Sequence, residues 1–156
     1  MPDALLEAAR TTLDGSLREL RKQLEGLEAN ALNDRPGGDG TNPLAVLAVH
    51  ALASTHSWLA LATGSALPPR DRPREFETRV DDPVAFLASV DATSDACREI
   101  LAGAEGIDPG KTGTAPWRTG TEAEEPVTAA WALLHALDHL REHVGHAQLT
   151  RQLLPG

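Results

Sequence analysis

Apolar side chains recur along the chain at steps of three and four residues, a spacing that predicts amphipathic helices. The first helix is expected from about residue 4 to residue 29, with Asp3 as its N-terminal cap and Gly15 as a weak point. Polar residues occupy its other faces, so one side of this helix should pack against the rest of the protein. The apolar stripe consists of Leu5, Leu6, Ala9, Leu13, Leu17, Leu20, Leu24 and Leu27.

The second predicted helix, from Pro43 to about Thr63, is apolar on nearly every face and should therefore be central in the fold. Pro43 suits the first helical position, where a missing N–H does no harm, and Gly64 should end the helix. The segment is long enough to span a bilayer, but it contains His50, His56 and several hydroxyl side chains. A buried core helix is the better interpretation, and we expect no membrane partner.

The third helix should begin after Asp81 or Asp82, with Pro83 in its first turn. We interpret Cys97 in this helix as a small core residue rather than a nucleophile, because Arg98 is its only basic neighbour in sequence. The inner stripe of the helix consists of Phe86, Leu87, Val90, Ser94, Cys97, Ile100 and Leu101.

A fourth helix is expected from Pro126 to about Leu154. The chain is then an all-α, four-helix bundle, which we expect to form a single domain over residues 1–156. Two longer polar connections, residues 65–81 and 106–125, should cross between the helices. Within the second connection, Trp117 and Arg118 are expected to form a short extended piece that covers one end of the bundle.

Composition narrows the classes of function. The formal net charge of −9 and the aromatic content of 3%, with no tyrosine, argue against a nucleic-acid-binding surface. The single cysteine excludes an intramolecular disulfide and fits a reducing compartment. The first residues, Met1 to Glu7, lack the basic and apolar regions of a secretory signal. We therefore expect a water-soluble, cytoplasmic protein.

Candidate chemistry is concentrated in the fourth helix, where four of the six histidines fall within twelve residues. At about 100° per residue, His139 and His143 lie nearest the buried face, whereas His135 and His146 lie farther out. Two histidines one turn apart can reach the same ion through neutral imidazole nitrogens, which suit Zn, Ni, Fe or Cu. A third ligand must come from another helix, and His50 is the only other histidine on an inward-facing stripe.

Three protein ligands would leave an open coordination position, which is typical of catalytic rather than structural zinc sites. A bound ion could lower the pKa of a water molecule or of a thiol. The alternative is that the histidines are ordinary polar residues at the flank of a helix, which is our interpretation for the two outer ones. The segment from His139 to His143 also matches the H-x-x-E-H signature of inverted zinc proteases. However, Glu142 should face solvent, and few residues follow for a further ligand.

The order and spacing of the helices, together with two short motifs, resemble the DinB-like superfamily of four-helix bundles. One motif is Asn-Pro-Leu-Ala-Val-Leu-Ala-Val-His at 42–50, and the other is His139-x3-His143-x-Gly145, followed by Gln-Leu-Thr-Arg-Gln-Leu at 148–153. This superfamily includes the metal-binding half of mycothiol-dependent maleylpyruvate isomerases and the bacillithiol and mycothiol S-transferases. The resemblance implies a divalent metal, most often Zn or Ni, held by the three histidines, and it implies a homodimer.

With this resemblance, the sequence predicts a metal-dependent enzyme, a transferase that activates a low-molecular-weight thiol such as mycothiol or bacillithiol for reaction with a small-molecule substrate. The catalytic group would be the metal-bound thiol or water. The alternatives are a non-catalytic bundle that binds a metal or small ligand, and a stress-associated dimer without catalysis. Five loop arginines could engage a thiol cofactor's carboxylate, but we expect each of them to be solvated: Arg35, Arg70, Arg72, Arg74 and Arg118.

Overall fold

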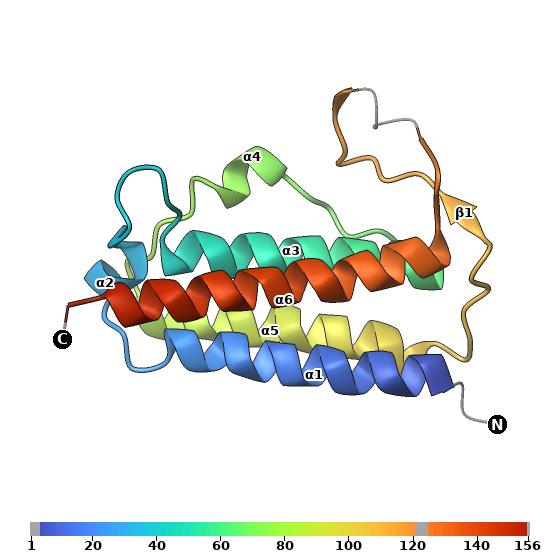
Figure 1. Cartoon of the computed structure of the whole chain (residues 1–156), viewed down its shortest axis with the longest axis horizontal. Coiled ribbons are helices and arrows are strands. Elements are labelled where there is room, and N and C mark those ends of the chain that lie inside the picture. Colours follow the sequence, from blue (N-terminus) through green and yellow to red (C-terminus); the bar gives the residue numbers. More distant parts are fainter. Residues whose placement is uncertain (1–3, 121–124, 156) are drawn as a thin grey trace.

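Four long helices pack side by side in the computed structural model, which describes residues 4–120 and 125–155 (Figure 1). In Figure 1, α3 and α5 run in one direction and α1 and α6 run in the other. The predicted all-α, four-helix bundle is therefore confirmed. The elements are α1 (Ala4–Leu24), α2 (Ala29–Asn33), α3 (Leu44–Thr63), α4 (Arg72–Glu75), α5 (Pro83–Gly103), β1 (Thr112–Gly113), β2 (Val127–Thr128) and α6 (Ala129–Leu153).

The first helix ends at Leu24, earlier than the leucine spacing predicts. Gly26 adopts a left-handed conformation with φ of 69°, which stops the helix just after its last buried leucine. A long-range contact also favours this end, because Arg151 of α6 donates to the backbone carbonyls of Gln23 and Glu25, both at 3.1 Å. Carbonyls at a helix end need such partners, and sequence spacing gives no sign of one supplied by a residue so far along the chain.

The helix α3 is the centre of the bundle, as its apolar composition predicts. None of its 20 residues is exposed, and it packs most extensively against α6 and then against α5. By length and composition alone it could cross a membrane, but 78% of its most apolar stretch is buried inside the fold, as expected for a core helix. Gly64, with φ of 72°, ends the helix as predicted.

The starts of α5 and α6 show one correct and one incorrect boundary prediction. The carboxylate of Asp82 accepts hydrogen bonds from Val84 and Ala85, and Pro83 occupies the first turn of α5 as expected. The last helix begins at Ala129 rather than at Pro126. The intervening residues of β2 pair antiparallel with β1, and this ladder delays the start of the helix.

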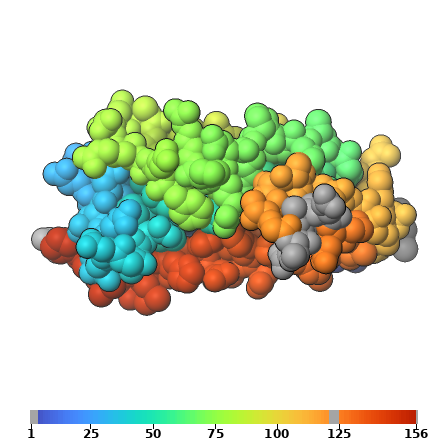
Figure 2. All heavy atoms as spheres, turned by 90° about the horizontal axis from the view of Figure 1, so that it is seen from above, coloured from blue at the N-terminus to red at the C-terminus, as the bar shows by residue number. Residues whose placement is uncertain are grey.

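Two connections lie over the same side of the bundle. Residues 64–82 run back along α3 and include α4, whereas residues 104–120 and 125–128 lie at one end and include β1 and β2 (Figure 1). Seen from that side in Figure 2, the green and orange connections cover much of α3 and one end of α6, whereas the rest of α6, in red, stays visible. Trp117 lies in a turn rather than in the predicted extended piece; among the described residues of this connection, the extended backbone is at β1 and β2.

Candidate metal centre

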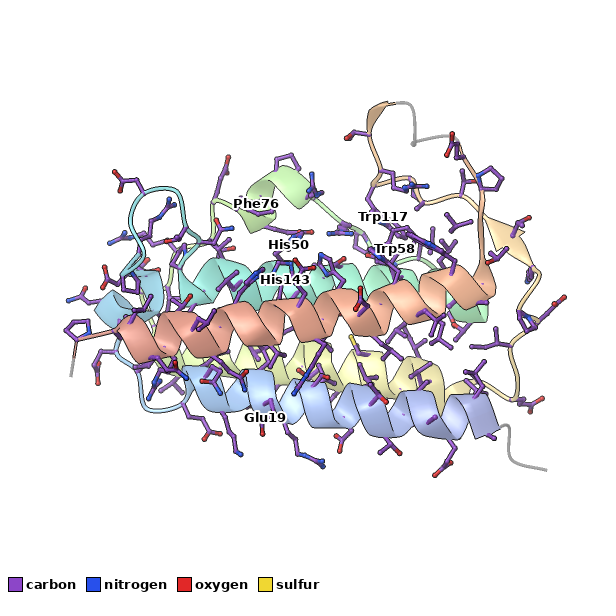
Figure 3. All side chains as sticks on the ribbon, in the orientation of Figure 1. Glu19, His50, Trp58, Phe76, Trp117 and His143 are labelled. Carbon is purple, nitrogen blue, oxygen red and sulfur yellow. The ribbon has the colours of Figure 1, made fainter. Side chains whose placement is uncertain are left out.

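Three histidines from two helices converge between α3 and α6. His50 comes from α3, and His139 and His143 come from successive turns of α6. One nitrogen from each ring lies within 4.8 Å of the others, and the Nε2 atoms of His139 and His143 are 3.2 Å apart. Figure 3 shows His50 and His143 close together midway along the bundle. The structure therefore brings together the three residues that the sequence singles out.

Small residues explain why these imidazoles can meet. Alanines are buried on both helices, Ala48 and Ala51 on α3 and Ala132 and Ala136 on α6. Helices with small side chains at their contact can pack with their axes close together. A histidine that projects from one helix then reaches histidines on the other across a short distance.

Glu75, a residue that no sequence pattern singles out, fixes the orientation of His50. Nδ1 of His50 lies 2.7 Å from Oε2 of Glu75, and both side chains are buried. A carboxylate beside Nδ1 accepts a hydrogen bond from the Nδ1–H group, so the proton stays on Nδ1 and Nε2 keeps a lone pair that can bind a metal. Phe76, next in the chain, packs its ring 4.8 Å from the imidazole of His50 (Figure 3).

Arg70 holds the carboxylate of Glu75 in place. Its Nε donates to Oε1 at 2.7 Å and its Nη2 to Oε2 at 3.2 Å, and only 5% of its side-chain surface is exposed. Burial alone would raise the pKa of Glu75, but the hydrogen bonds from His50 and Arg70 outweigh burial and lower it. Glu75 is therefore ionised at neutral pH and can serve both partners.

His139 and His143, the two cluster histidines of α6, are held in the neutral state. Burial, with a further contribution from neighbouring histidines, lowers the pKa of His139 to about 3 and that of His143 to about 4. Nδ1 of His139 is buried and has no hydrogen-bond partner among the described residues. Nδ1 of His143 lies 3.3 Å from Nδ1 of the exposed His146. Both imidazoles therefore keep an unprotonated nitrogen at neutral pH, which is what a metal requires.

The donor set fits a divalent metal that prefers nitrogen ligands. In a tetrahedral zinc site, nitrogens about 2.0–2.1 Å from the ion lie roughly 3.3 Å from each other. The observed Nε2–Nε2 distance of 3.2 Å between His139 and His143 matches this spacing. The carboxylate behind His50 completes the carboxylate–histidine pair that accompanies many metal-bound imidazoles. These observations make His50, His139 and His143 a set that could hold an ion.

A cavity of about 390 Å³ opens beside the histidines. Two of the three histidines, His50 and His139, form part of its wall, so a molecule in the cavity would lie next to the candidate metal position. Three tryptophans and three arginines form much of the remaining wall. The lining residues are His50, Ser54, Trp58, Arg70, Arg72, Trp117, Arg118, Thr119, Trp131, His135 and His139.

His56, His135 and Cys97 lie outside the three-histidine cluster, each in a different environment. His135, which helix geometry placed with the outer residues, lines the cavity and stacks on Trp131 with ring centres 4.5 Å apart. His56 is half-buried and is not part of the three-histidine cluster. Cys97 is fully buried as predicted, and burial, opposed in part by Arg98, raises the pKa of its thiol to about 12. A thiol with that pKa is unreactive at neutral pH.

The prediction of solvated loop arginines is wrong for one residue and incomplete for two. Arg70 is almost fully buried against Glu75, because the connection folds down onto α3. Arg72 and Arg118 also line the cavity. Arg35 and Arg74 are exposed as expected and take no part in its wall.

Taken together, the helix order and the three-histidine cluster define a DinB-like four-helix bundle. Within that class, the sequence model of the mycothiol-S-transferase family matches residues 8–156, and the chain belongs to this family.

Comparison with other known proteins adds support for the fold. The crystal structure of a conserved protein from Enterococcus faecalis aligns with a TM-score of 0.72 and 17% sequence identity, covering 94% of this chain and 95% of that one. At this identity the likeness concerns the fold alone. No curated protein matches the chain by sequence.

Proposed function

We propose that the protein is a metal-dependent S-transferase that joins a low-molecular-weight thiol to a small electrophile, with mycothiol as the first candidate thiol. The observation that carries the proposal is the three-histidine cluster beside a cavity, in a chain of the mycothiol-S-transferase family. His50, His139 and His143 would hold the ion, most plausibly Zn or Ni. Bound there, a divalent cation would supply the positive charge that lowers the pKa of a thiol and so favours its thiolate.

The protein's own residues would prepare this site. Glu75 accepts a hydrogen bond from the Nδ1–H group of His50, and Arg70 keeps that carboxylate ionised and correctly placed. The lowered pKa values of His139 and His143 keep their lone pairs free at neutral pH. The ring of Phe76, at the end of α4, packs 4.8 Å from the imidazole of His50.

The transfer itself is a substitution or an addition at carbon. The thiol loses its proton to solvent, and the sulfur lone pair forms a new S–C bond with the electrophile. In a substitution the bond to the leaving group breaks and that group departs with the electron pair. In an addition to a polarised double bond, the displaced electron pair takes up a proton from solvent. Cys97 has no part in this step because its thiol is buried and protonated.

Elemental analysis of untagged protein tests the metal part of the proposal first. We expect about one equivalent of a divalent transition metal per chain. Thiol consumption is then followed with mycothiol, bacillithiol and glutathione in the presence of chlorinated and unsaturated electrophiles. Metal without thiol consumption for any pair would leave a metal-binding bundle and reject the transferase. Absence of metal, together with no metal uptake on addition of Zn or Ni, would reject both.

We infer further that the chain works as a single domain in the cytoplasm and as a homodimer. The absence of a possible intramolecular disulfide suits a reducing compartment. The exposed leucines Leu5 and Leu134 border an apolar hollow between α1 and α6, which a second subunit could cover. Sedimentation velocity at several protein concentrations measures the oligomeric state, and a monomer throughout would remove the dimer.

A further inference from the structure

The tryptophans of this chain gather at one place. All three, Trp58, Trp117 and Trp131, line the cavity beside the candidate metal centre. The ring of Trp58 is 5.0 Å from that of Trp117 and 5.2 Å from that of Trp131, and it meets both at steep angles of 86° and 71°. Figure 3 shows Trp58 and Trp117 close together. Trp131 is 43% exposed, so an apolar aromatic surface faces the open space.

The charge of this wall is opposite to that of the whole protein. The chain has 23 acidic and 14 basic residues, yet the cavity is lined by Arg70, Arg72 and Arg118, and no acidic side chain lines it in the described part of the chain. An adjoining hollow includes Asp71, whose carboxylate is engaged in capping α4. Arg70 is already paired with the ionised Glu75, so the positive charge that this part of the wall presents to a ligand comes mainly from Arg72 and Arg118, and it favours an anion.

Two of these arginines lie against the tryptophan faces. The guanidinium carbon of Arg70 is 5.7 Å from the ring centre of Trp117, and that of Arg118 is 5.9 Å from the ring centre of Trp131. Arg70 uses Nε and Nη2 to hold Glu75, while its Nη1 has no hydrogen-bond partner among the described residues. Guanidinium groups bind carboxylates through such N–H groups, and aromatic faces bind flat unsaturated groups. Both kinds of contact occur here within one wall.

We propose that this wall is the subsite for the electrophilic co-substrate and that it selects a flat, unsaturated, negatively charged molecule, such as an aryl or α,β-unsaturated carboxylate. The proposal rests on the proposed thiol transfer, since it assigns the second substrate of that reaction. Low-molecular-weight thiols are built from cysteine and polar groups, so the thiol would use little of an aromatic wall. The unsaturated part would lie along the parts of Trp131 and Trp117 that His135 and the arginines leave uncovered, and the carboxylate would face Arg72 and Arg118.

Binding can be measured without any turnover. Because every tryptophan lies in the wall, ligand binding should change the intrinsic fluorescence, and calorimetry provides an independent affinity. The probes are cinnamate, its neutral isostere cinnamamide, and 3-cyclohexylpropanoate, which keeps the charge but lacks the flat ring. We expect cinnamate to bind about tenfold or more tightly than either comparison compound, because each lacks one of the two kinds of contact. Equal affinity for cinnamate and cinnamamide would overturn the proposal.

Matched variants locate the binding. Arg72→Gln/Arg118→Gln should weaken cinnamate binding about tenfold, whereas Arg74→Gln/Arg79→Gln removes the same charge outside the cavity and should leave it unchanged. Trp131→Leu should weaken binding, as measured by calorimetry, whereas Trp131→Phe should restore most of it. If the two double variants behave alike, the anion is attracted by overall charge and the subsite is rejected.

Two further experiments distinguish this subsite from two alternatives: binding of the carboxylate to a metal, and binding of the thiol to the same wall. In His143→Ala, cinnamate should still bind if the wall holds it, and loss of binding would show that the carboxylate binds a metal instead. Mycothiol added to saturation should not displace cinnamate, and displacement would assign the wall to the thiol. The proposed transferase is rejected by missing metal or by missing thiol consumption, and the cinnamate titrations measure neither of these. The subsite fails on the cinnamate comparisons even in a protein that transfers thiols.

Discussion

The candidate metal centre draws on two kinds of structure that differ in how they hold their residues. His50, His139 and His143 stand on long helices whose backbone is fixed by many hydrogen bonds and by the α3–α6 contact. Glu75 comes from a connection that packs onto α3 through a few side chains. Trp117, in the wall of the cavity, likewise comes from a connection. The helices supply the ligands, whereas the connections set the orientation of one ligand and the walls around it.

The largest expected effect is the loss of a helix-borne ligand. His139→Ala should reduce metal affinity by more than about 100-fold, beyond the range expected for a residue that only orients a ligand. The measurement is elemental analysis of untagged protein, followed by competition with a chelator of known affinity. His56→Ala is the control, because this histidine is half-buried on α3 and outside the cluster. Full metal content in His139→Ala would show that the cluster is not the metal site.

A smaller loss of metal affinity is expected when Glu75, in the connection of residues 64–82, is changed. Glu75→Gln keeps the size of the side chain but removes the charge that holds the Nδ1 proton of His50, so metal affinity should fall about 10- to 100-fold. Glu77→Gln, two residues away and exposed, removes the same charge and should have no effect. The same chelator competition measures both variants. If Glu75→Gln binds metal as tightly as the unaltered protein, the connection does not contribute to the metal centre.

The metal-free protein should lose stability as pH falls. The pKa values of His139 and His143 are about 3 and about 4 in the fold, against an ordinary value of 6.5. Between about pH 6.5 and pH 4 the unfolded chain binds protons at these positions and the folded chain does not, so the free energy of unfolding decreases in this window. Above pH 6.5 the two histidines add no pH dependence to the free energy of unfolding. The lowered pKa of Glu75 acts separately, because its contribution is lost only below its ordinary value of 4.5.

Urea unfolding of the metal-free protein at a series of pH values measures this dependence. The double variant His139→Gln/His143→Gln provides the comparison, since its side chains do not titrate. It should show a shallower decrease in the free energy of unfolding between pH 6.5 and pH 4. Parallel curves for the two proteins would mean that these histidines are not held in the neutral state by the fold.

The smallest effect is expected at Gly64, the residue that ends α3 and begins the connection of residues 64–82. Gly64 has φ of 72° at the end of α3, so Gly64→Ala should lower the free energy of unfolding by about 1 kcal/mol. Gly103 ends α5 without a positive φ, and a Cβ there meets no atom within 4 Å. Gly103→Ala should therefore be neutral or slightly stabilising. Thermal unfolding of both variants distinguishes conformational strain from a general effect of removing glycine.

The sequence predicts which helix-borne histidines come together, for a physical reason. Helical periodicity fixes which residues share a face, so His139 and His143 could be paired by spacing alone, and His50 by its inward stripe. Glu75 has no such signal, because it stands in a polar connection among other charged residues. Its role depends on how residues 64–82 fold back onto α3, which no local pattern encodes.

The same reasoning explains the mistakes. His135 lies farther from the buried face than His139, so periodicity placed it among the ordinary polar residues at the flank of the helix, yet the connections and Trp131 turn that flank into a cavity wall. Arg70 was expected to be solvated because loops usually are, but one buried carboxylate draws it inside. In each case a tertiary contact outweighs the local expectation.

Arg70 contacts Glu75, and Glu75 contacts His50. These contacts would couple the folding of residues 64–82 to metal binding by the three-histidine cluster. If Glu75 favours the ion, the ion must favour the docked position of Glu75 by the same free energy. Residues 64–82 should then exchange their amide hydrogens more slowly when metal is present, and the segment should resist proteolysis in proportion to metal supply. Cells short of metal would therefore hold a form of this protein that is easier to degrade.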